Sequence, residues 1–411
     1  MLQSDKERTL ELLNELRKIG EYKTGVHRPT FSDEDMQARE WVVKKLRDMG
    51  YTAKIDGIGN VFGKSPKNGP HLLSGSHLET QNYSGWLDGS LGVVYALEAA
   101  RILQDDESLG NCGIDVVAFA DEETHFSPKF IGSNSFAGLV EDTYLDGCFD
   151  RNGRGSLKSF RQKFGLYEKE RQTLIHNRHI GFVEAHIEQG LQLWSENLNV
   201  GIVQSIAAAW KYKIKFYGEA NHAGTTKMSM RKDAGIMLMK FWYQIEARYP
   251  EIANENTVWT VGAVELLPGQ PSIIPGHAEM TFQFRDVNYN TLIKLEAELQ
   301  SIANELNEKY GYKIEIEKKA EGAPASFDKT YLSILEKLAQ KIRPNQYKLM
   351  SSGAQHDAQV FASIIPTAMI FIPSIDGISH HWKENTSDED IMNGVEYYVE
   401  AMRSLLQTIH N

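Results

Sequence analysis

The fold depends first on one short stretch, Ile114-Asp115-Val116-Val117-Ala118-Phe119-Ala120, which is apolar almost throughout. A similar stretch, His71-Leu72-Leu73-Ser74-Gly75-Ser76, precedes it, and the segment Leu91 to Leu103 between them is typical of a helix. Short apolar runs of this kind indicate strands that are buried on both faces of a parallel sheet. The sequence therefore predicts an α/β fold with a mainly parallel sheet and flanking helices.

Residues typical of metal ligands follow both stretches directly. His77 comes after the first stretch and the pair Glu122-Glu123 comes after the second. The carboxyl ends of parallel strands meet at one edge of a sheet, and ligands of open α/β sheets bind there. Asp88 lies between them in the chain, in a glycine-lined turn before the helix. We therefore expect these side chains to gather at one edge of the sheet.

Each of these motifs also has an ordinary explanation. A lone His-x-Glu motif such as His77 with Glu79 is more often surface decoration, although the Glu79 carboxylate could orient a metal-binding imidazole. Asp88 could cap the helix that follows it. The pair Glu122-Glu123, preceded by Asp121, could be a solvated acidic loop. Adjacent acids repel each other, however, and a nearby cation would remove that repulsion.

Taken together, the acids and histidines suit two metal ions. Divalent ions such as Zn²⁺ bind imidazole and carboxylate groups, and a bridging carboxylate can hold two ions about 4 Å apart to activate a water. The sequence therefore favours a hydrolase. Along the chain, the series consists of His77, Asp88, Glu122-Glu123, His186 and His380.

The middle of the chain changes pattern. At 411 residues the chain is long enough for two or three domains. The segments from 209 to 325 follow the order β-α-β-β-α-β, which is typical of a ferredoxin-like domain. We therefore expect one domain over 1–208 and 326–411, ending in a helix from Asp388 to Gln407, with a second domain inserted at 209–325. The expected segments of the inserted domain are Lys211–Tyr217, Met230–Tyr249, Val258–Leu266, Ala278–Phe284, Asn290–Tyr310 and Tyr312–Lys318.

Composition and charge exclude several classes of protein. With 44 basic residues against 55 acidic ones the net charge is −11, and no basic tail or stripe is available to bind nucleic acid. The two cysteines, Cys112 and Cys148, form no Cys-x-x-Cys motif, so a reducing cytoplasm is expected. The helical segment Met1 to Gly20 is charged throughout, unlike a signal peptide, and no apolar run approaches about 18 residues. We therefore expect no membrane partner.

The ordered motifs resemble those of a known family. Over nearly the whole chain the sequence is similar to the dinuclear metal amidohydrolases related to aminoacylases and zinc exopeptidases. It most resembles the hydantoinase/carbamoylase branch, which includes N-carbamoyl-L-amino acid hydrolases and allantoate amidohydrolases. The motifs are Gly75-Ser76-His77-Leu78-Glu79-Thr80, Asp88-Gly89, Glu122-Glu123, Glu184-Ala185-His186-Ile187-Glu188-Gln189-Gly190, Asn221-His222-Ala223-Gly224-Thr225-Thr226, Ser352-Gly353-Ala354-Gln355-His356-Asp357-Ala358 and Gly377-Ile378-Ser379-His380.

The resemblance implies a zinc-exopeptidase-like catalytic domain that binds two divalent ions per subunit, either Zn²⁺ or one of Mn²⁺, Co²⁺ and Ni²⁺. Glu122 is implied as the general base, kept off the metal, and His381 as a residue that packs beside the ligands. The implied ligands are His77, Asp88 as the bridge, Glu123, His186 and His380.

The resemblance also assigns roles to the inserted domain, which acts in the family as a dimerisation domain and lid. The family histidine that matches His222 reaches the partner's active site and stabilises the oxyanion; a surface turn histidine is the alternative. Arg285 matches the arginine that holds the substrate carboxylate, and an edge-strand arginine paired with Asp286 is the alternative. The other implied substrate contacts are Gln189, Ser272, Gly353 and Ala354.

Some positions depart from the family pattern. Many members have aspartate at Glu79, asparagine at Ser272 and glycine at Gln355, and the family's arginine is missing from Thr124-His125-Phe126. The first change bears on His77, while the positions of Ser272 and Gln355 lie on the implied substrate side. The chemistry is therefore expected to be retained, with a substrate that can differ from the usual ones.

The sequence thus predicts a cytoplasmic homodimer that hydrolyses a linear amide or ureido bond of an N-substituted amino acid, with an N-carbamoyl-L-amino acid as the first candidate. The alternatives are an allantoate amidohydrolase and an aminoacylase or dipeptidase-like enzyme. Outside enzymes, the alternative is a non-catalytic ligand-binding protein on the same scaffold. The presence of Glu122 beside all five ligands argues against that last reading.

Overall fold

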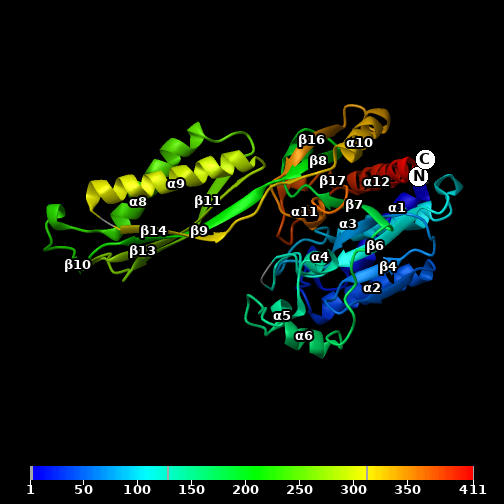
Figure 1. Ribbon diagram of the computed structural model, residues 1–411, viewed down its shortest axis with the longest axis horizontal. Helices are drawn as coiled ribbons and strands as arrows, with labels where there is room; N and C mark the ends of the chain where they lie inside the picture. Colours follow the sequence, from blue (N-terminus) through cyan, green and yellow to red (C-terminus); the bar gives the residue numbers. More distant parts are fainter. Residues whose placement is uncertain (1–2, 127–128, 312, 411) are drawn as a thin grey trace. The chain divides into compact units, whose positions relative to one another are not determined.

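The chain forms two compact units. The computed structural model describes residues 3–126, 129–311 and 313–410 (Figure 1). The first unit comprises Met1–Gln204, Ser326–Met350 and His356–Asn411, and the second comprises Ser205–Ala325 and Ser351–Gln355. The first unit is therefore discontinuous in sequence.

The first unit is built on a nine-stranded sheet in the order β15-β8-β17-β7-β5-β6-β4-β3, with β16 paired to β8. The four central strands, β17, β7, β5 and β6, are parallel, and antiparallel strands flank them. The expected α/β fold is therefore confirmed. The strands are β3 (Thr52–Ile55), β4 (Val61–Lys64), β5 (His71–His77), β6 (Gly113–Phe119), β7 (His179–Ile187), β8 (Val200–Ile206), β15 (Ala325–Ser326), β16 (Tyr347–Ser352) and β17 (Thr367–Ile372).

The two apolar stretches are the strands β5 and β6, and every residue of both is buried. Helix α3 (Ser90–Leu103) packs on β5, β6 and β7, and α12 (Asp388–His410) packs on α3. Three further helices, α1 (Gln3–Arg17), α2 (Asp33–Asp48) and α10 (Lys329–Ile342), complete the main layers around the sheet (Figure 1). Burial of both strand faces explains their continuous apolar sequence.

Helix α2 begins with a reciprocal cap. The Asp35 backbone N–H donates to Ser32 Oγ over 3.1 Å, and the Asp35 carboxylate accepts from the Phe31 backbone N–H over 2.8 Å. Such caps satisfy backbone donors that the first turn leaves free. The shorter elements of the unit are β1 (Glu21–Tyr22), β2 (Gly25–Val26), η1 (Glu107–Leu109), α4 (Ile131–Phe136), α5 (Asp142–Leu145), α6 (Leu157–Lys163), α7 (Gln192–Ser195), α11 (Ala358–Phe361) and η4 (Ile375–Gly377).

The second unit is an antiparallel sheet in the order β11-β13-β9-β14, against which α8 and α9 pack. Its strands and helices follow one another in the order expected from the sequence. The elements are β9 (Ala208–Tyr217), α8 (Ala234–Arg248), β11 (Val258–Leu267), β13 (His277–Asp286), α9 (Tyr289–Tyr310) and β14 (Lys313–Ala320), with β10 (Asn221–His222), η2 (Met228–Met230), η3 (Tyr249–Glu251) and β12 (Ile273–Ile274).

Two expected boundaries in this unit need comment. Helix α8 starts at Ala234 and not at Met230, because the Asp233 side chain accepts hydrogen bonds from the Gly235 and Ile236 N–H groups and so caps the helix there. Tyr312, expected to open the last strand, lies outside the described residues.

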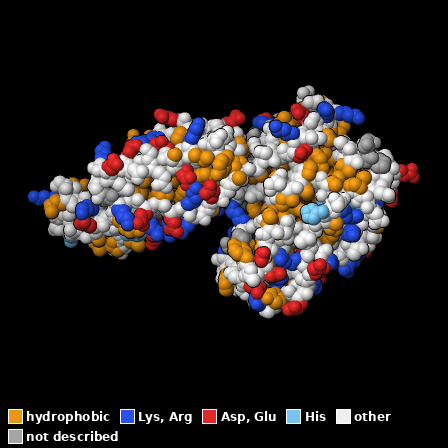
Figure 2. Space-filling model, in the orientation of Figure 1, with side chains coloured by type: hydrophobic (Ala, Val, Ile, Leu, Met, Phe, Trp, Pro, Cys, Tyr) orange, Lys and Arg blue, Asp and Glu red, His pale blue; other side chains and the backbone are white. Residues whose placement is uncertain are grey.

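The surface carries charges of both signs. Figure 2 shows acidic and basic side chains interspersed over the face that it draws. Within residues 3–126, 129–311 and 313–410, no helix has the length and apolar character needed to span a bilayer.

Candidate metal centre

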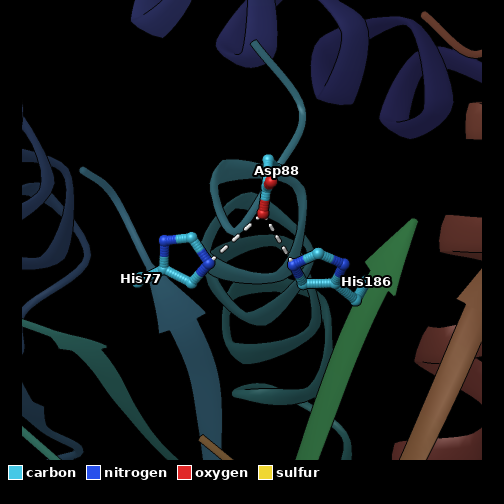
Figure 3. A group of neighbouring side chains, drawn as sticks. All are labelled: His77, Asp88 and His186. Atoms are coloured by element: carbon cyan, nitrogen blue, oxygen red, sulfur yellow. Dashed lines mark ion pairs between the residues drawn. The ribbon is translucent and has the colours of Figure 1, made fainter. Parts of the chain in front are cut away.

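A first group of ligand-type side chains gathers at the carboxyl end of the central strands. His77 is the last residue of β5, His186 lies near the end of β7, and Asp88 lies in the turn before α3. Asp88 Oδ1 is 3.4 Å from His77 Nε2 and 3.1 Å from His186 Nε2 (Figure 3). The three side chains are at most 2% exposed. Three buried groups that can each bind a metal therefore point to one place.

The turn that carries Asp88 depends on the glycine that follows it. Gly89 has a φ of 65°, and a Cβ at this position would collide with the His77 ring. Only glycine adopts this conformation without cost and leaves room for the imidazole. The Asp88-Gly89 pair thus brings the carboxylate against both histidines. The alternative that Asp88 merely caps α3 does not apply, since the N-cap residue is Gly89 and no side-chain cap is made at that helix start.

A second group shares Asp88 with the first. Asp88 Oδ2 is 3.3 Å from His380 Nε2, which is 3.6 Å from Glu123 Oε2. In each group, the potential ligand atoms lie within 4.8 Å of one another. The His380 side chain is 52% exposed, so this group borders solvent. The neighbouring His381 lies against the Trp382 ring and belongs to neither group.

Glu122 lies beside the first group without belonging to either. Its Oε2 atom is 3.7 Å from His77 Nε2, and its backbone N–H donates to Glu79 Oε1 over 2.6 Å. The two adjacent glutamates therefore face different partners, with Glu123 toward His380 and Glu122 toward His77. A solvated acidic loop does not describe them, because both side chains are buried.

The imidazole hydrogen bonds agree with metal binding. His77 Nδ1 donates to the Glu79 carbonyl oxygen and His186 Nδ1 to the Ile187 carbonyl oxygen, both over 2.9 Å. These bonds fix the tautomer, so that each Nε2 atom carries a lone pair and lies close to Asp88. His186 Nε2 also accepts the Gly89 N–H over 3.1 Å. His77 Nε2 is buried without a hydrogen bond. A nitrogen lone pair facing carboxylate oxygens needs a cation between them, so the residues present fit a divalent ion.

The charges of the group reinforce this conclusion. Burial alone would lower the pKa of His77, but the carboxylates of Glu122 and Asp88 raise it well above its ordinary value. The hydrogen bond to Asp88, with Glu123 nearby, raises the pKa of His380 to about 9. Burial together with the charge of Asp88 raises the pKa of Glu123. The surplus of negative charge thus favours positive charge at both groups, which a metal ion supplies.

Glu79 plays a part different from the expected one. Glu79 and His77 are both buried, so they are not surface decoration. The alternative was that the Glu79 carboxylate orients the His77 imidazole, but the backbone carbonyl of Glu79 does so. The carboxylate instead binds Arg39 Nη2 over 2.7 Å and accepts the Glu122 N–H. It therefore positions the backbone of the Glu122-Glu123 pair and neutralises the charge of the buried Arg39.

Sequence reasoning missed Gln81, which lies two residues after Glu79. Its Nε2 donates to Glu123 Oε2 over 2.6 Å and to the Glu123 carbonyl oxygen over 3.0 Å, and its backbone N–H donates to Glu123 Oε1 over 3.1 Å. Gln81 therefore holds the Glu123 carboxylate in place. Its position directly after the His77 motif was the available signal.

The sequence also did not single out three further residues near the centre, His356, Asp357 and Glu384. The His356 ring lies 4.5 Å from that of His186, in an edge arrangement, and both oxygens of Asp357 are buried without a hydrogen bond. Glu384 is 1% exposed, and burial together with Asp88 raises its pKa to about 8. His356 and Asp357 were noted only as part of a motif.

The substrate-contact candidates divide between the units. In the first unit, Gln189 Nε2 donates to Asp88 Oδ2 over 2.9 Å. In the second unit, Arg285 Nη1 donates to the Gly353 carbonyl oxygen over 2.7 Å, and the adjacent Ala354 carbonyl accepts from Ser352 Oγ. β13, which carries Arg285, lies inside its sheet and not at its edge.

His222 and Ser272 also lie together in the second unit. They belong to the paired segments around β10 and β12, where the Ala223 N–H donates to the Ser272 carbonyl oxygen over 2.9 Å. His222 is exposed, and its Nδ1 accepts the Gly224 N–H over 3.0 Å, which leaves Nε2 available to another molecule.

Comparison with known proteins places these features in a family context. Residues 79–404 match Peptidase family M20/M25/M40. The N-carbamoyl-L-amino-acid amidohydrolase of Paenarthrobacter aurescens is 29% identical over 97% of this chain and 98% of its own length. The allantoate amidohydrolase of Escherichia coli K12 is 31% identical over 90% of this chain and 91% of its own.

Two further similarities extend this range. The ureidoglycolate hydrolase of Oryza sativa subsp. japonica is 32% identical over 92% of this chain and 80% of its own length. Among solved structures, an amidase of the hydantoinase/carbamoylase family from Burkholderia phymatum is 37% identical, with a TM-score of 0.92 over 99% of this chain and 98% of its own. The relatives that are similar in sequence are thus named for different substrates.

Proposed function

The chain belongs to peptidase family M20/M25/M40 and is a metal-dependent amidohydrolase of linear carbon–nitrogen bonds, and we propose that its substrate is an N-carbamoyl-L-amino acid. One observation supports this most strongly. Two ligand groups share the buried Asp88, and Glu122 faces the first of them without belonging to it. The proposed products are the amino acid, carbon dioxide and ammonia.

The proposed ligands are those of the two groups: His77, Asp88 and His186 for one ion, and Asp88, Glu123 and His380 for the other. Two divalent ions, when bound, supply Lewis acidity that polarises the scissile carbonyl and lowers the pKa of water. The nitrogen and oxygen donors accept Zn²⁺, Mn²⁺, Co²⁺ or Ni²⁺, and availability in the cell decides between them.

Glu122 is the proposed general base. Its carboxylate stands 3.7 Å from His77 Nε2, close enough to the ligands to take a proton from the attacking water. The same carboxylate then donates that proton to the leaving nitrogen. Replacing Glu122 by Gln keeps the shape and removes the basicity, so Glu122→Gln should retain its metal and lose turnover by about 10²–10⁴-fold. Full turnover with intact metal content would dismiss the role.

Residues of the second unit, together with Gln189, are the proposed substrate contacts. Arg285 supplies a planar guanidinium for the substrate carboxylate, a pairing that two parallel hydrogen bonds make specific. Gly353, whose carbonyl oxygen accepts from Arg285, and the adjacent Ala354 supply polar groups beside the guanidinium. Ser272, in the segment that pairs with that of His222, and the amide oxygen of Gln189 are the remaining proposed contacts. Arg285→Lys should raise KM more than it lowers kcat, because lysine keeps the positive charge but cannot form two parallel hydrogen bonds to a carboxylate. An unchanged KM would remove Arg285 from the site.

We also propose that the protein is a cytoplasmic homodimer that associates through the second unit. Helix α8 exposes the large apolar side chains of Ile236, Met239 and Tyr243, with exposures of 38%, 64% and 69%. His222 of the partner subunit would then stabilise the oxyanion. His222→Ala should lose turnover while keeping metal and dimer, as measured by kinetics, metal analysis and light scattering. A monomeric protein with full activity would refute both statements.

A substrate panel tests the proposed function. Protein loaded separately with Zn²⁺, Mn²⁺, Co²⁺ and Ni²⁺ is assayed with N-carbamoyl, N-acyl and dipeptide compounds, allantoate and ureidoglycolate, and ammonia release is compared with free carboxylate release. Hydrolysis of N-carbamoyl amino acids with release of ammonia supports the proposal. Preference for allantoate or ureidoglycolate would instead assign the chain the substrate for which that relative is named. Turnover of acyl compounds alone would indicate an aminoacylase-like enzyme, and no turnover despite bound metal would revive a binding role.

A further inference from the structure

Asp88 is held at both ends by one closed ring of hydrogen bonds. Its backbone N–H donates to Glu384 Oε1 over 3.1 Å, and its side-chain Oδ2 accepts from Gln189 Nε2 over 2.9 Å. Ser379 joins the other two residues, because its Oγ accepts from Gln189 Nε2 over 3.0 Å and donates to Glu384 Oε2 over 3.1 Å. We name Glu384, Ser379 and Gln189 the Asp88 ring.

The donors and acceptors of the ring are consistent with one another. One amide hydrogen of Gln189 goes to Asp88 and the other to Ser379, whose single hydroxyl hydrogen goes on to Glu384. Glu384 Oε1 accepts the Leu87 N–H as well, over 3.3 Å. His380 Nε2 is a more distant neighbour of Gln189 Nε2, at 3.4 Å. Because each of the shorter bonds joins one donor to one acceptor, changing any single member breaks the ring at a defined point.

The surrounding chain is shaped to accommodate the ring. A Cβ at Gly85 would collide with the Glu384 carboxylate, so glycine makes room for it. Gln189 and His380 both have positive φ angles, of 56° and 54°, which are costly for residues other than glycine. The Gln189 N–H donates to Ser374 Oγ over 3.0 Å and so helps to hold this conformation. Strained residues beside a ligand group indicate that the surroundings enforce their position.

We propose that Glu384, Ser379 and Gln189 are positioning residues that fix the Asp88 carboxylate for two ions and set the affinity of the more weakly held one. This inference rests on the proposed function, since it requires Asp88 to bind metal. The ring joins three separate chain segments, which carry Asp88, His186 with Gln189, and His380. Breaking it frees the Asp88 carboxylate to rotate, and loss of partners that orient ligands typically costs 10–100-fold in metal affinity.

The test uses three variants and one matched control. Ser379→Ala cuts the ring at its junction, Gly85→Ala pushes the Glu384 carboxylate out of place, and Ser379→Thr keeps the hydroxyl. Asn385→Ala is the control. Asn385 Oδ1 accepts from Trp86 Nε1 over 3.2 Å, and this bond joins the segment of Asp88 to the segment of Glu384 without being part of the ring. Full-length protein is equilibrated with buffered Zn²⁺, and bound zinc is counted by elemental analysis together with its rate of release to a chelator.

We expect Ser379→Ala and Gly85→Ala to weaken the second zinc ion by roughly 10–100-fold, with Ser379→Thr and Asn385→Ala staying close to the unchanged protein. If Ser379→Ala fails to fold, Gly85→Ala carries the test. The proposed role of the ring would be overturned if Ser379→Ala and Gly85→Ala bound two zinc ions with unchanged affinity. It would also be overturned if Asn385→Ala lost zinc affinity equally, or if Ser379→Thr had an affinity as low as that of Ser379→Ala. An unchanged protein that does not take up two zinc ions would instead overturn the proposed function.

Discussion

The strands β5, β6 and β7 carry a cluster of acids and histidines at each end, and the two clusters differ in charge balance. The amino-end cluster consists of His71, Asp115, Arg178 and His179. Arg178 binds Asp115 through two hydrogen bonds of 2.6 and 2.9 Å, and His179 Nε2 lies 3.0 Å from the same carboxylate. Its single carboxylate is therefore fully partnered by the protein.

At the carboxyl ends the balance is reversed. Asp88 is contacted by three imidazoles, and the carboxylates of Glu122 and Glu123 lie close by. Arg39, a buried cation of this region, pairs with Asp35 and Glu79 and not with the ligand groups. The two ends thus use similar residue types for different purposes. A cluster whose charge the protein itself neutralises needs no added ion and is costly to break, whereas a cluster with surplus carboxylate is suited to bind a cation.

The largest expected effect is at the carboxyl end. Asp88→Ala removes the residue shared by both groups, so we expect turnover to fall by about 10³-fold or more, together with metal content. Metal analysis and ammonia release measure both. The variant should still fold, because removing a carboxylate relieves the surplus negative charge. If Asp88→Ala retained two metal ions, the carboxyl-end cluster would not be the metal site and the contrast with the amino-end cluster would fail.

The matched change at the amino end should act on stability. Asp115→Ala leaves Arg178 buried without its carboxylate, and breaking a buried pair in this way costs about 3–5 kcal/mol. Denaturant unfolding measures the loss. Protein that remains folded should hold as much metal per chain as the unchanged enzyme. A loss of metal from this fraction would show that the two ends are coupled.

The next largest effect is the loss of stability that acid causes through His71 of the amino-end cluster. Burial lowers the pKa of His71 to about 4, although the charge of Asp115 opposes this. An unfolded chain takes up this proton near pH 6.5, so the contribution to stability is complete above that pH and is lost as the pH falls toward 4. The loss amounts to about 3 kcal/mol.

His71→Asn tests this assignment. The Asn side chain can still donate to the Gly69 carbonyl oxygen, which accepts from His71 Nδ1 over 2.7 Å. Unfolding curves of metal-free protein should then depend less on pH between 6.5 and 4. The pKa of Asp115 is lowered to about 2 by its hydrogen bonds to His179 and Arg178, against the effect of burial, so it remains charged throughout this range. An unchanged pH dependence would exclude His71 as the source.

The smallest effect concerns metal and folding together. Metal that binds only the folded chain stabilises it by about 2.7 kcal/mol at a concentration of 100 Kd. Thermal unfolding with and without Zn²⁺ should show this increase in the unchanged protein and in His71→Asn. Asp88→Ala should show none. An equal increase in Asp88→Ala would mean that the stabilising ion binds elsewhere.

Much of the fold could be predicted because its signals are local. The apolar runs at β5 and β6 and the alternation at β9 follow directly from which faces are buried. The start of α8 was placed too early, since its pattern extends past the cap at Asp233. Patterns of burial determine where an element lies, while a single side chain determines where it begins.

The site was predictable to a different degree. The sequence indicated His77, Asp88 and the glutamate pair, because they follow strands whose ends meet. Gln81 and Glu384 could not be found in this way, since a hydrogen bond to Glu123 or to the Asp88 backbone depends on three-dimensional placement. The amino-end cluster was missed for the same reason, as nothing in the sequence pairs Arg178 with Asp115.

The discontinuity of the first unit has a consequence for biosynthesis. The ribosome produces His77, Asp88, Glu123 and His186 early, then makes nearly half of the chain, including the whole second unit, before His380 appears. At roughly 5–20 residues per second this interval lasts on the order of ten to forty seconds. During that time the nascent chain contains every ligand of the first group but lacks His380 of the second. Loading of the second ion is therefore necessarily a late event, which follows completion of the polypeptide and closure of its last segment onto the sheet.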